Sequence, residues 1–162
     1  MRLSRVLLPI LIVGVVAGYW TWHRHSHAAP QLSKAQLREA QVDLRQLMQA
    51  HVHEEYSRMS FFIWHDQPLT PDKMNEIAES SARMVNLAQN LSEYENTYIQ
   101  QGWGKQDVKF FDENRTRLLQ TAEQLKGAAK EGDESRVVHL FNHMDSTCQS
   151  CHKRFRPDLS WS

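Results

Sequence analysis

Four amphipathic segments, each ended by helix-breaking residues, constrain the fold of this chain more than any other feature. The segments run from Ser33 to His65, from Thr70 to Gly102, from Val108 to Gly132 and from Asp133 to Pro157. Apolar or small residues recur along each segment at steps of three and four, which is the period of a helix with one buried face. No segment alternates as a β-strand does. We therefore expect an all-α fold, an antiparallel four-helix bundle with the apolar stripes facing inward.

Helix-capping patterns support these boundaries. Ser33 precedes Gln36 by three residues, which is the spacing of a capping box. Thr70 stands before Pro71, so that a good N-cap residue is followed by proline at the first helical position. Asp133 is placed to cap the last segment. The segments therefore carry their own start signals.

An apolar run near the amino terminus is typical of an export signal or a membrane anchor. Arg2 and Arg5 precede the uncharged residues 6–22. As a helix this run would be roughly 25 Å long, and the aromatic residues at its outer end favour retention as a transmembrane helix. Ser26 and Ala28, in contrast, fit cleavage after Ala28. Both outcomes remain open, and both export the rest of the chain.

We divide the chain into residues 1–30, a signal peptide or transmembrane anchor with a short linker, and residues 31–162, the bundle domain. Two arginines before the apolar run and one after it favour a cytoplasmic amino terminus. His23, His25 and His27 are interpreted as part of a solvated linker, because no cysteine or acidic residue lies nearby to complete a metal site. The expected location is the periplasm, with a tether to the bacterial inner membrane.

The charge of the bundle domain limits its partners. Three of the 19 basic residues lie in the leader, so residues 31–162 hold 16 basic and 19 acidic residues. A domain with this small negative excess has no surplus of cations for phosphates, and we expect no nucleic-acid partner. A partner protein with a basic docking patch fits the charge better.

The two cysteines of the chain form one motif, Cys148-Gln149-Ser150-Cys151-His152. On a helix, both thiols and the imidazole fall within an arc of roughly 100° and face the bundle interior. The sequence Cys-x-x-Cys-His is the attachment signature of c-type haem. Each thiol adds to one vinyl group, and the adjacent imidazole becomes an axial ligand of the iron. We expect one covalently bound haem c.

Three other readings of the motif are less consistent with the sequence. A thioredoxin-like pair needs a helix amino terminus, whereas Cys148 and Cys151 fall near a helix end. A zinc site would need His139 and His143 as further ligands, and both point elsewhere on a helical wheel. A disulfide would leave the following histidine unexplained.

On this motif and its place near the carboxyl terminus, the chain resembles the class II c-type cytochromes, the cytochrome c-prime family and its low-spin relatives. The resemblance covers residues 31–157 and includes the Phe155-Arg156 tail. It implies one haem inside the bundle with His152 as the fifth ligand. From its position four residues after Cys151, Phe155 is expected to pack against the porphyrin or the neighbouring helix. Arg156, a cation at the carboxyl end of this helix, is expected either to pair with a haem propionate or simply to cap the helix. Family members often dimerise through their first two helices, so a homodimer is a further expectation.

The sixth iron ligand is the open question of the site. The resemblance places it on the first helix, about one turn after an arginine, and Met48 follows Arg45 there. A methionine ligand raises the reduction potential and suits electron transfer. His51, His53 and Met59 are alternative ligands, and an open position is the remaining one.

These inferences predict a carrier of single electrons between redox partners, in which the haem performs the redox step. No catalytic triad, phosphate loop or nucleotide fingerprint is present in the sequence, and we expect no enzymatic activity. A five-coordinate protein that binds NO or CO is the first alternative. A helical adaptor clipped by a disulfide is the second.

Overall fold

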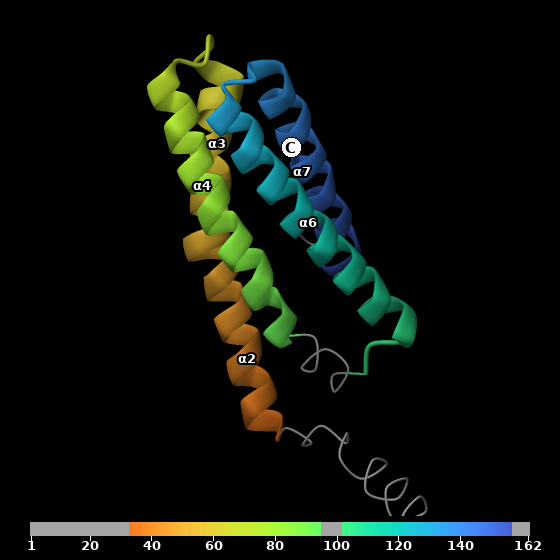
Figure 1. Ribbon diagram of the computed structural model, residues 1–162. Helices are drawn as coiled ribbons and strands as arrows, with labels where there is room; N and C mark the ends of the chain where they lie inside the picture. The colour runs from red at the N-terminus through yellow and green to blue at the C-terminus, as the bar shows by residue number, and fades with distance from the viewer. Residues whose placement is uncertain (1–32, 95–101, 157–162) are drawn as a thin grey trace, which may run out of the picture. The chain divides into compact units, whose positions relative to one another are not determined.

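The computed structural model describes residues 33–94 and 102–156, which form packed helices without a strand in these ranges (Figure 1). In chain order they are α2 (Lys34–Gln46), the π-helical turn η1 (Leu47–Val52), α3 (His53–His65), α4 (Pro71–Asn90), the 3-10 turn η2 (Leu91–Tyr94), α6 (Lys105–Glu131) and α7 (Glu134–Phe155). The predicted helical bundle is confirmed for these residues. The predicted leader, residues 1–30, lies outside them. No helix in the two described ranges has both the length and the apolarity of a membrane span.

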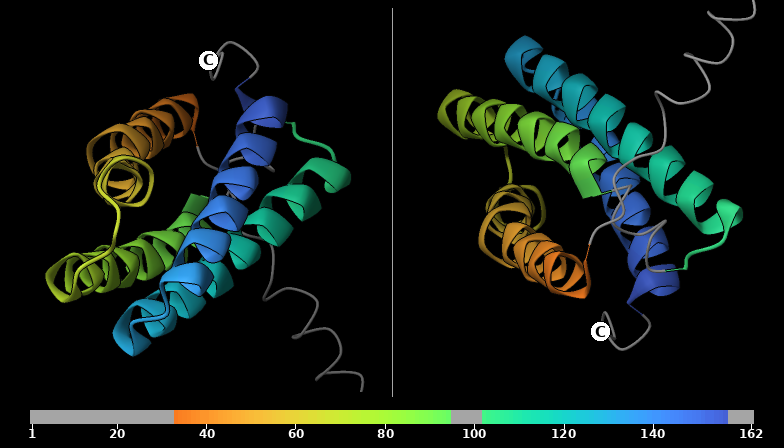
Figure 2. Two further views of the ribbon diagram at one scale, coloured as in Figure 1. Left: turned by 90° about the horizontal axis from the view of Figure 1, so that it is seen from above. Right: turned by 90° about the horizontal axis from the view of Figure 1, so that it is seen from below.

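The helices of the unit Leu32–Ser162 pack in sequence order. Because α2, η1 and α3 follow one another without a break, they form one long first helix, and α3 packs on α4. Next, α4 lies along α6, and α6 lies along α7 (Figure 2). The largest fully buried side chains are Phe141, Met59, Ile63, Ile77, Met84, Leu125, Met144 and Val137. They come from α3, α4, α6 and α7, so one core joins all four helices.

The predicted caps are present. Ser33 and Gln36 exchange two hydrogen bonds, in which each backbone N–H donates to the other side chain at 2.9 and 3.3 Å. The Thr70 and Asp133 side chains each accept a hydrogen bond from the backbone N–H three residues on. Gly132 ends α6 with a φ of 71°, a left-handed conformation that favours glycine. Local sequence signals therefore predicted where α2, α4 and α7 begin and where α6 ends. In contrast, α4 ends at Asn90, before the predicted Gly102, and α6 begins at Lys105, three residues before the predicted Val108.

The π-helical turn Leu47–Val52 is a feature that the apolar stripe did not predict. In a regular α-helix Val52 would lie about 80° around the axis from Leu44. A π turn holds about one extra residue, which sets the following residues back by roughly 100°. Leu44, Val52 and Tyr56 can then all pack against the core, as they do. The π turn thus rotates the residues that follow it, so that the apolar side chains before and after the turn lie on the same side of the first helix.

An ion pair between α3 and α4 follows directly after the π turn. The Glu55 carboxylate is 7% exposed, and its Oε1 accepts a hydrogen bond from Nε of Arg83 at 2.6 Å. Burial raises the pKa of this carboxyl, but the hydrogen bond and charge of Arg83 outweigh burial and leave the pKa below its usual value. Next along α3, Sδ of Met59 accepts a hydrogen bond from the Ser81 hydroxyl at 3.5 Å. These contacts fix α3 on α4.

Replacing Arg83 with methionine should destabilise the protein by about 1–3 kcal/mol at pH 7, because the buried Glu55 carboxylate loses its cation. In the wild type the lowered pKa stabilises the fold above the unfolded-state pKa, and this contribution is lost as the pH falls through the folded-state pKa. The difference between wild type and Arg83→Met should therefore shrink towards pH 4. Urea unfolding at both pH values measures it.

Glu79→Gln is the matched control, since Glu79 is an exposed partner of Arg83 at 3.7 Å. Exposed pairs contribute little, and its effect should stay below about 0.5 kcal/mol. Equal losses in the two variants would contradict the role given to Glu55.

Candidate functional site

The Cys-x-x-Cys-His motif lies in the last two turns of α7. Cys148 and Cys151 are free thiols, partly buried, and both pack against the hydrophobic core. Arg154 of α7 donates a hydrogen bond to Asp107 of α6. Because Cys151 lies one helical turn before Arg154, it lies on the same side of α7, the side that faces α6. His152 is partly buried beside it. The helix therefore brings the two thiols and the imidazole to adjacent sides, as predicted from the spacing.

Burial changes the protonation of all three groups. It raises the pKa of Cys148 to about 12, with a further contribution from the charge of Asp145, and it raises the pKa of Cys151 to about 11. It lowers the pKa of His152, as does the nearby charge of Arg156. At neutral pH the thiols are protonated and the imidazole is neutral, which is the form of histidine that binds a metal.

Aromatic rings surround the end of α7. Phe155 stacks on Trp103, with ring centroids 4.2 Å apart and planes at 5°. Phe110 and Phe111 of α6 contact the same ring edge-on, at 5.9 and 6.1 Å. We predicted Phe155 as a packing residue, whereas sequence analysis assigned no contact to Trp103. No local pattern could have revealed the stack, because it joins residues far apart in the chain.

The basic residues after the motif have different surroundings. Nε of Arg154 donates to Oδ1 of Asp107 at 2.8 Å, and its guanidinium lies over the Phe110 ring at 4.8 Å. Arg154 therefore ties α7 to the start of α6. Arg156, the predicted propionate partner, is partly buried at the C-cap of α7 and close enough to His152 to lower its pKa.

The side of α7 that faces the first helix carries a hydrogen-bonded carboxylate. The Tyr56 hydroxyl donates to Oδ1 of Asp145 at 2.7 Å, and the Tyr56 ring stacks on Phe141 with centroids 5.3 Å apart. Nε2 of Gln149 donates to Oδ2 of Asp145, also at 2.7 Å. Asp145 lies one turn before Cys148, so this contact between α3 and α7 borders the motif.

The Tyr56–Asp145 contact reveals which residues of the first helix face the motif. His152 follows Asp145 by seven residues, about two turns, and so points to the same side of α7. Met48 precedes Tyr56 by eight residues, and the π turn takes up about one of them, so Met48 also lies about two turns from the contact and on its side. Because the helices run antiparallel, this count of residues predicts that Met48 and His152 lie at nearly the same level on facing sides.

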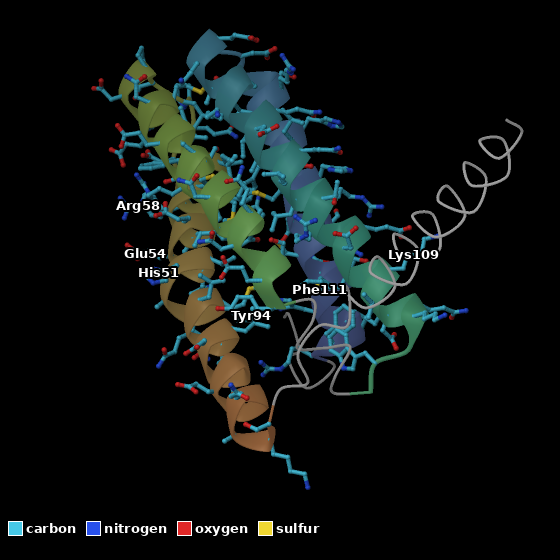
Figure 3. All side chains as sticks on the ribbon, turned by 60° about the horizontal axis from the view of Figure 1, so that its bottom comes forward. His51, Glu54, Arg58, Tyr94, Lys109 and Phe111 are labelled. Carbon is cyan, nitrogen blue, oxygen red and sulfur yellow. The ribbon has the colours of Figure 1, made fainter. Side chains whose placement is uncertain are left out.

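The other three candidates for the sixth ligand lie elsewhere. His51 and His53 are exposed, and Nε2 of His53 is 3.4 Å from the Ser57 hydroxyl. Figure 3 shows His51 on the side of the first helix that points away from the other helices. Met59 is fully buried between α3 and α4, with its sulfur bonded to Ser81. Met48 is partly buried against the core and is the candidate that helical geometry places towards the motif.

The structure also tests the three alternative interpretations of the motif, a thioredoxin-like pair, a zinc site and a disulfide. The cysteines lie at the carboxyl end of α7, not at a helix amino terminus as a thioredoxin-like site needs. His143 bonds Thr121 of α6 at 3.1 Å, and the described residues contain no group of three metal-binding side chains. The cysteines are not joined in a disulfide. Two reduced thiols and a neutral imidazole on one helix are the donor set that covalent haem requires.

The thiols should react slowly in the folded chain without haem. Their raised pKa values leave far less thiolate at pH 8 than an unperturbed cysteine has, and the thiolate is the reactive form. Alkylation by iodoacetamide, followed by mass spectrometry, should be more than about tenfold slower in buffer than in urea. Equal rates in the two conditions would contradict the burial of Cys148 and Cys151.

Comparison with known proteins assigns the chain to a family. A family model described as cytochrome c' matches residues 41–156, which includes most of the first helix and the whole motif. Comparisons with curated protein sequences and with solved structures gave no match. The match covers more than half of the chain and agrees with the donor set on α7. The chain therefore belongs to the cytochrome c' family, whose members carry covalently attached haem c.

Proposed function

We propose that this protein is an exported monohaem cytochrome that carries single electrons between redox partner proteins. The observation that supports this proposal most directly is the hydrogen bond from Tyr56 of the first helix to Asp145 of α7, from which helical geometry predicts Met48 opposite His152. Family membership supports it more broadly, because cytochrome c' proteins are generally electron carriers or gas-binding haem proteins rather than enzymes.

Bound haem c supplies a one-electron iron couple, and the residues of this chain hold it and control its surroundings. Cys148 and Cys151 would hold the haem through two thioether sulfurs, and His152 would supply a nitrogen ligand to its iron. Phe155, which stacks on Trp103, would shield the haem at the end of α7. Arg156, at the C-cap of α7, would pair with a propionate.

The proposed sixth ligand decides between the two functions of the family. A methionine sulfur on the face opposite His152 makes the iron six-coordinate, raises its potential and favours electron transfer. An open position would instead admit a gas such as NO or CO. Met48 is unbranched and only partly buried, so its thioether can turn towards a group between the first helix and α7.

Haem attachment and family both favour a location outside the cytoplasm. The leader, residues 1–30, lies outside the described residues, so the periplasmic location and the inner-membrane tether are proposals from its sequence. A tether would raise the local concentration of membrane-bound partners.

The purified protein, made in a host with the cytochrome c maturation machinery, should be heavier than its polypeptide by about 616 Da, the mass of one haem. It should keep haem peroxidase stain on a denaturing gel, because thioether bonds survive denaturation. Replacing both Cys148 and Cys151 with serine should abolish the stain, whereas Ser150→Ala, in the same helical turn, should retain it. A chain without the added mass would contradict covalent attachment.

Met48→Leu should remove the methionine-to-iron absorption band at about 695 nm from the spectrum of the oxidised protein. Met59→Leu is the matched control, since Met59 is fully buried between α3 and α4 and the band should persist. Leucine keeps a similar volume, so both variants should fold. A wild-type spectrum without the band would favour the gas-binding alternative over the electron carrier.

A further inference from the structure

The geometry points to Tyr56 as a positioning residue, whose hydrogen bond to Asp145 holds the turn Leu47–Val52 against the haem-binding part of α7. The inference rests on the proposed function, in which haem is attached to α7 and faces the first helix. It adds a residue that controls access to that face without itself binding iron.

Neighbouring side chains hold both residues of the Tyr56–Asp145 hydrogen bond in place. The phenol donates to one oxygen of the carboxylate at 2.7 Å, and Gln149 donates to the other at 2.7 Å. Stacking on Phe141 orients the Tyr56 ring, with an angle of 29° between the planes. Both ends of the hydrogen bond are therefore held in place, which makes the contact directional rather than a loose surface pair.

Polar and apolar contacts together join α3 to α7. The Tyr56 hydroxyl donates a hydrogen bond to Asp145. Phe141 contacts the rings of Tyr56 and Trp64 at centroid distances of 5.3 Å, and the buried core also includes side chains from both helices. Because apolar contacts are not directional, the hydrogen bond is the contact that favours one relative rotation and separation of the two helices at this level.

The position of Tyr56 in the chain connects this bond to the π turn. Glu55 ties α3 to Arg83 of α4, and Tyr56 ties it to Asp145 of α7. These adjacent residues lie one turn beyond Val52, the last residue of η1. The first helix is therefore anchored to two neighbours immediately after the turn that carries Met48.

The anchor determines what stands opposite His152. Met48 and His152 lie about two turns from the Tyr56–Asp145 contact, on the sides that face each other. A movement of α3 away from α7 at this contact would carry η1 with it, because the first helix is continuous through both. Loss of the hydrogen bond should therefore open the space between η1 and the haem-binding turn of α7.

The protonation state of Tyr56 suits this structural role. Burial raises its pKa, and the bond to Asp145 and the negative charge of that carboxylate raise it further. The phenol therefore remains a hydrogen-bond donor throughout the neutral pH range.

The test is the binding of free imidazole to the oxidised holoprotein, followed by absorbance. Tyr56→Phe keeps the ring that stacks on Phe141 and removes only the hydrogen bond. We expect it to bind imidazole roughly three- to tenfold more tightly than the wild type, the ratio that corresponds to one net hydrogen bond. We expect this higher imidazole affinity of Tyr56→Phe whether imidazole displaces Met48 or enters an open position.

Two further variants separate positioning from general loss of stability. Asp145→Asn keeps an oxygen that accepts from Tyr56, and its imidazole affinity should stay within about twofold of the wild type. Thr121→Val removes the hydrogen bond between the Thr121 hydroxyl of α6 and Nδ1 of His143 of α7, with little change of shape. It should lower the thermal midpoint but leave imidazole binding unchanged.

The outcomes are distinct from those that test the proposed function. Haem attached in every variant with equal imidazole affinities would overturn the role of Tyr56 and leave the cytochrome assignment intact. The same gain in Thr121→Val as in Tyr56→Phe would also overturn it. Absence of covalent haem in the wild type would contradict the proposed function, and the inference would fall with it.

Discussion

The helical period of α7 is the constraint on which the site depends. Two residues separate Cys148 from Cys151, so a helix puts the thiols one turn apart, and His152 follows about 100° further around the axis. An added or missing residue would turn one thiol out of the core. The attachment motif can serve one flat cofactor here because α7 remains regular until Phe155, after which Pro157 cannot continue it.

On the other side of the proposed site, the packing of the first helix depends on the π-helical turn Leu47–Val52. An uninterrupted α-helix could not keep Leu44 and Tyr56 on the same buried side, and the turn Leu47–Val52 removes the conflict. Polar contacts then hold the corrected phase. The buried Glu55 carboxylate is stabilised by a hydrogen bond from Arg83, and the Tyr56 hydroxyl is stabilised by its hydrogen bond to Asp145. If the first helix rotated about its own axis, these hydrogen bonds would be lost, so they favour one orientation of the helix.

Much of the fold was predictable because its signals are local. The capping box of Ser33 and Gln36, the N-cap at Thr70 and the left-handed Gly132 act within one helical turn, and the structure confirms each. The attachment motif is also local, and it indicated both the cofactor and the end of the bundle that holds it. Membership of the cytochrome c' family is consistent with that interpretation.

The parts that sequence analysis missed are long-range contacts. Trp103 stacks on Phe155, and Tyr56 bonds a residue 89 positions away. A pattern of apolar residues tells which side of a helix is buried, but not which neighbour that side meets. The turn at Leu47–Val52 has the same cause, since its extra residue is stabilised by packing against other helices rather than by local preference.

The sequence by itself determined the helical class, the helix ends and the donor set for haem, because each follows from residues within a few positions of one another. It left Met48, His51, His53 and Met59 as alternative ligands. Only the tertiary structure decided that Tyr56 of the first helix meets Asp145 of α7, since the relative level and rotation of two helices depend on contacts between them. Those contacts exist only once the chain has folded.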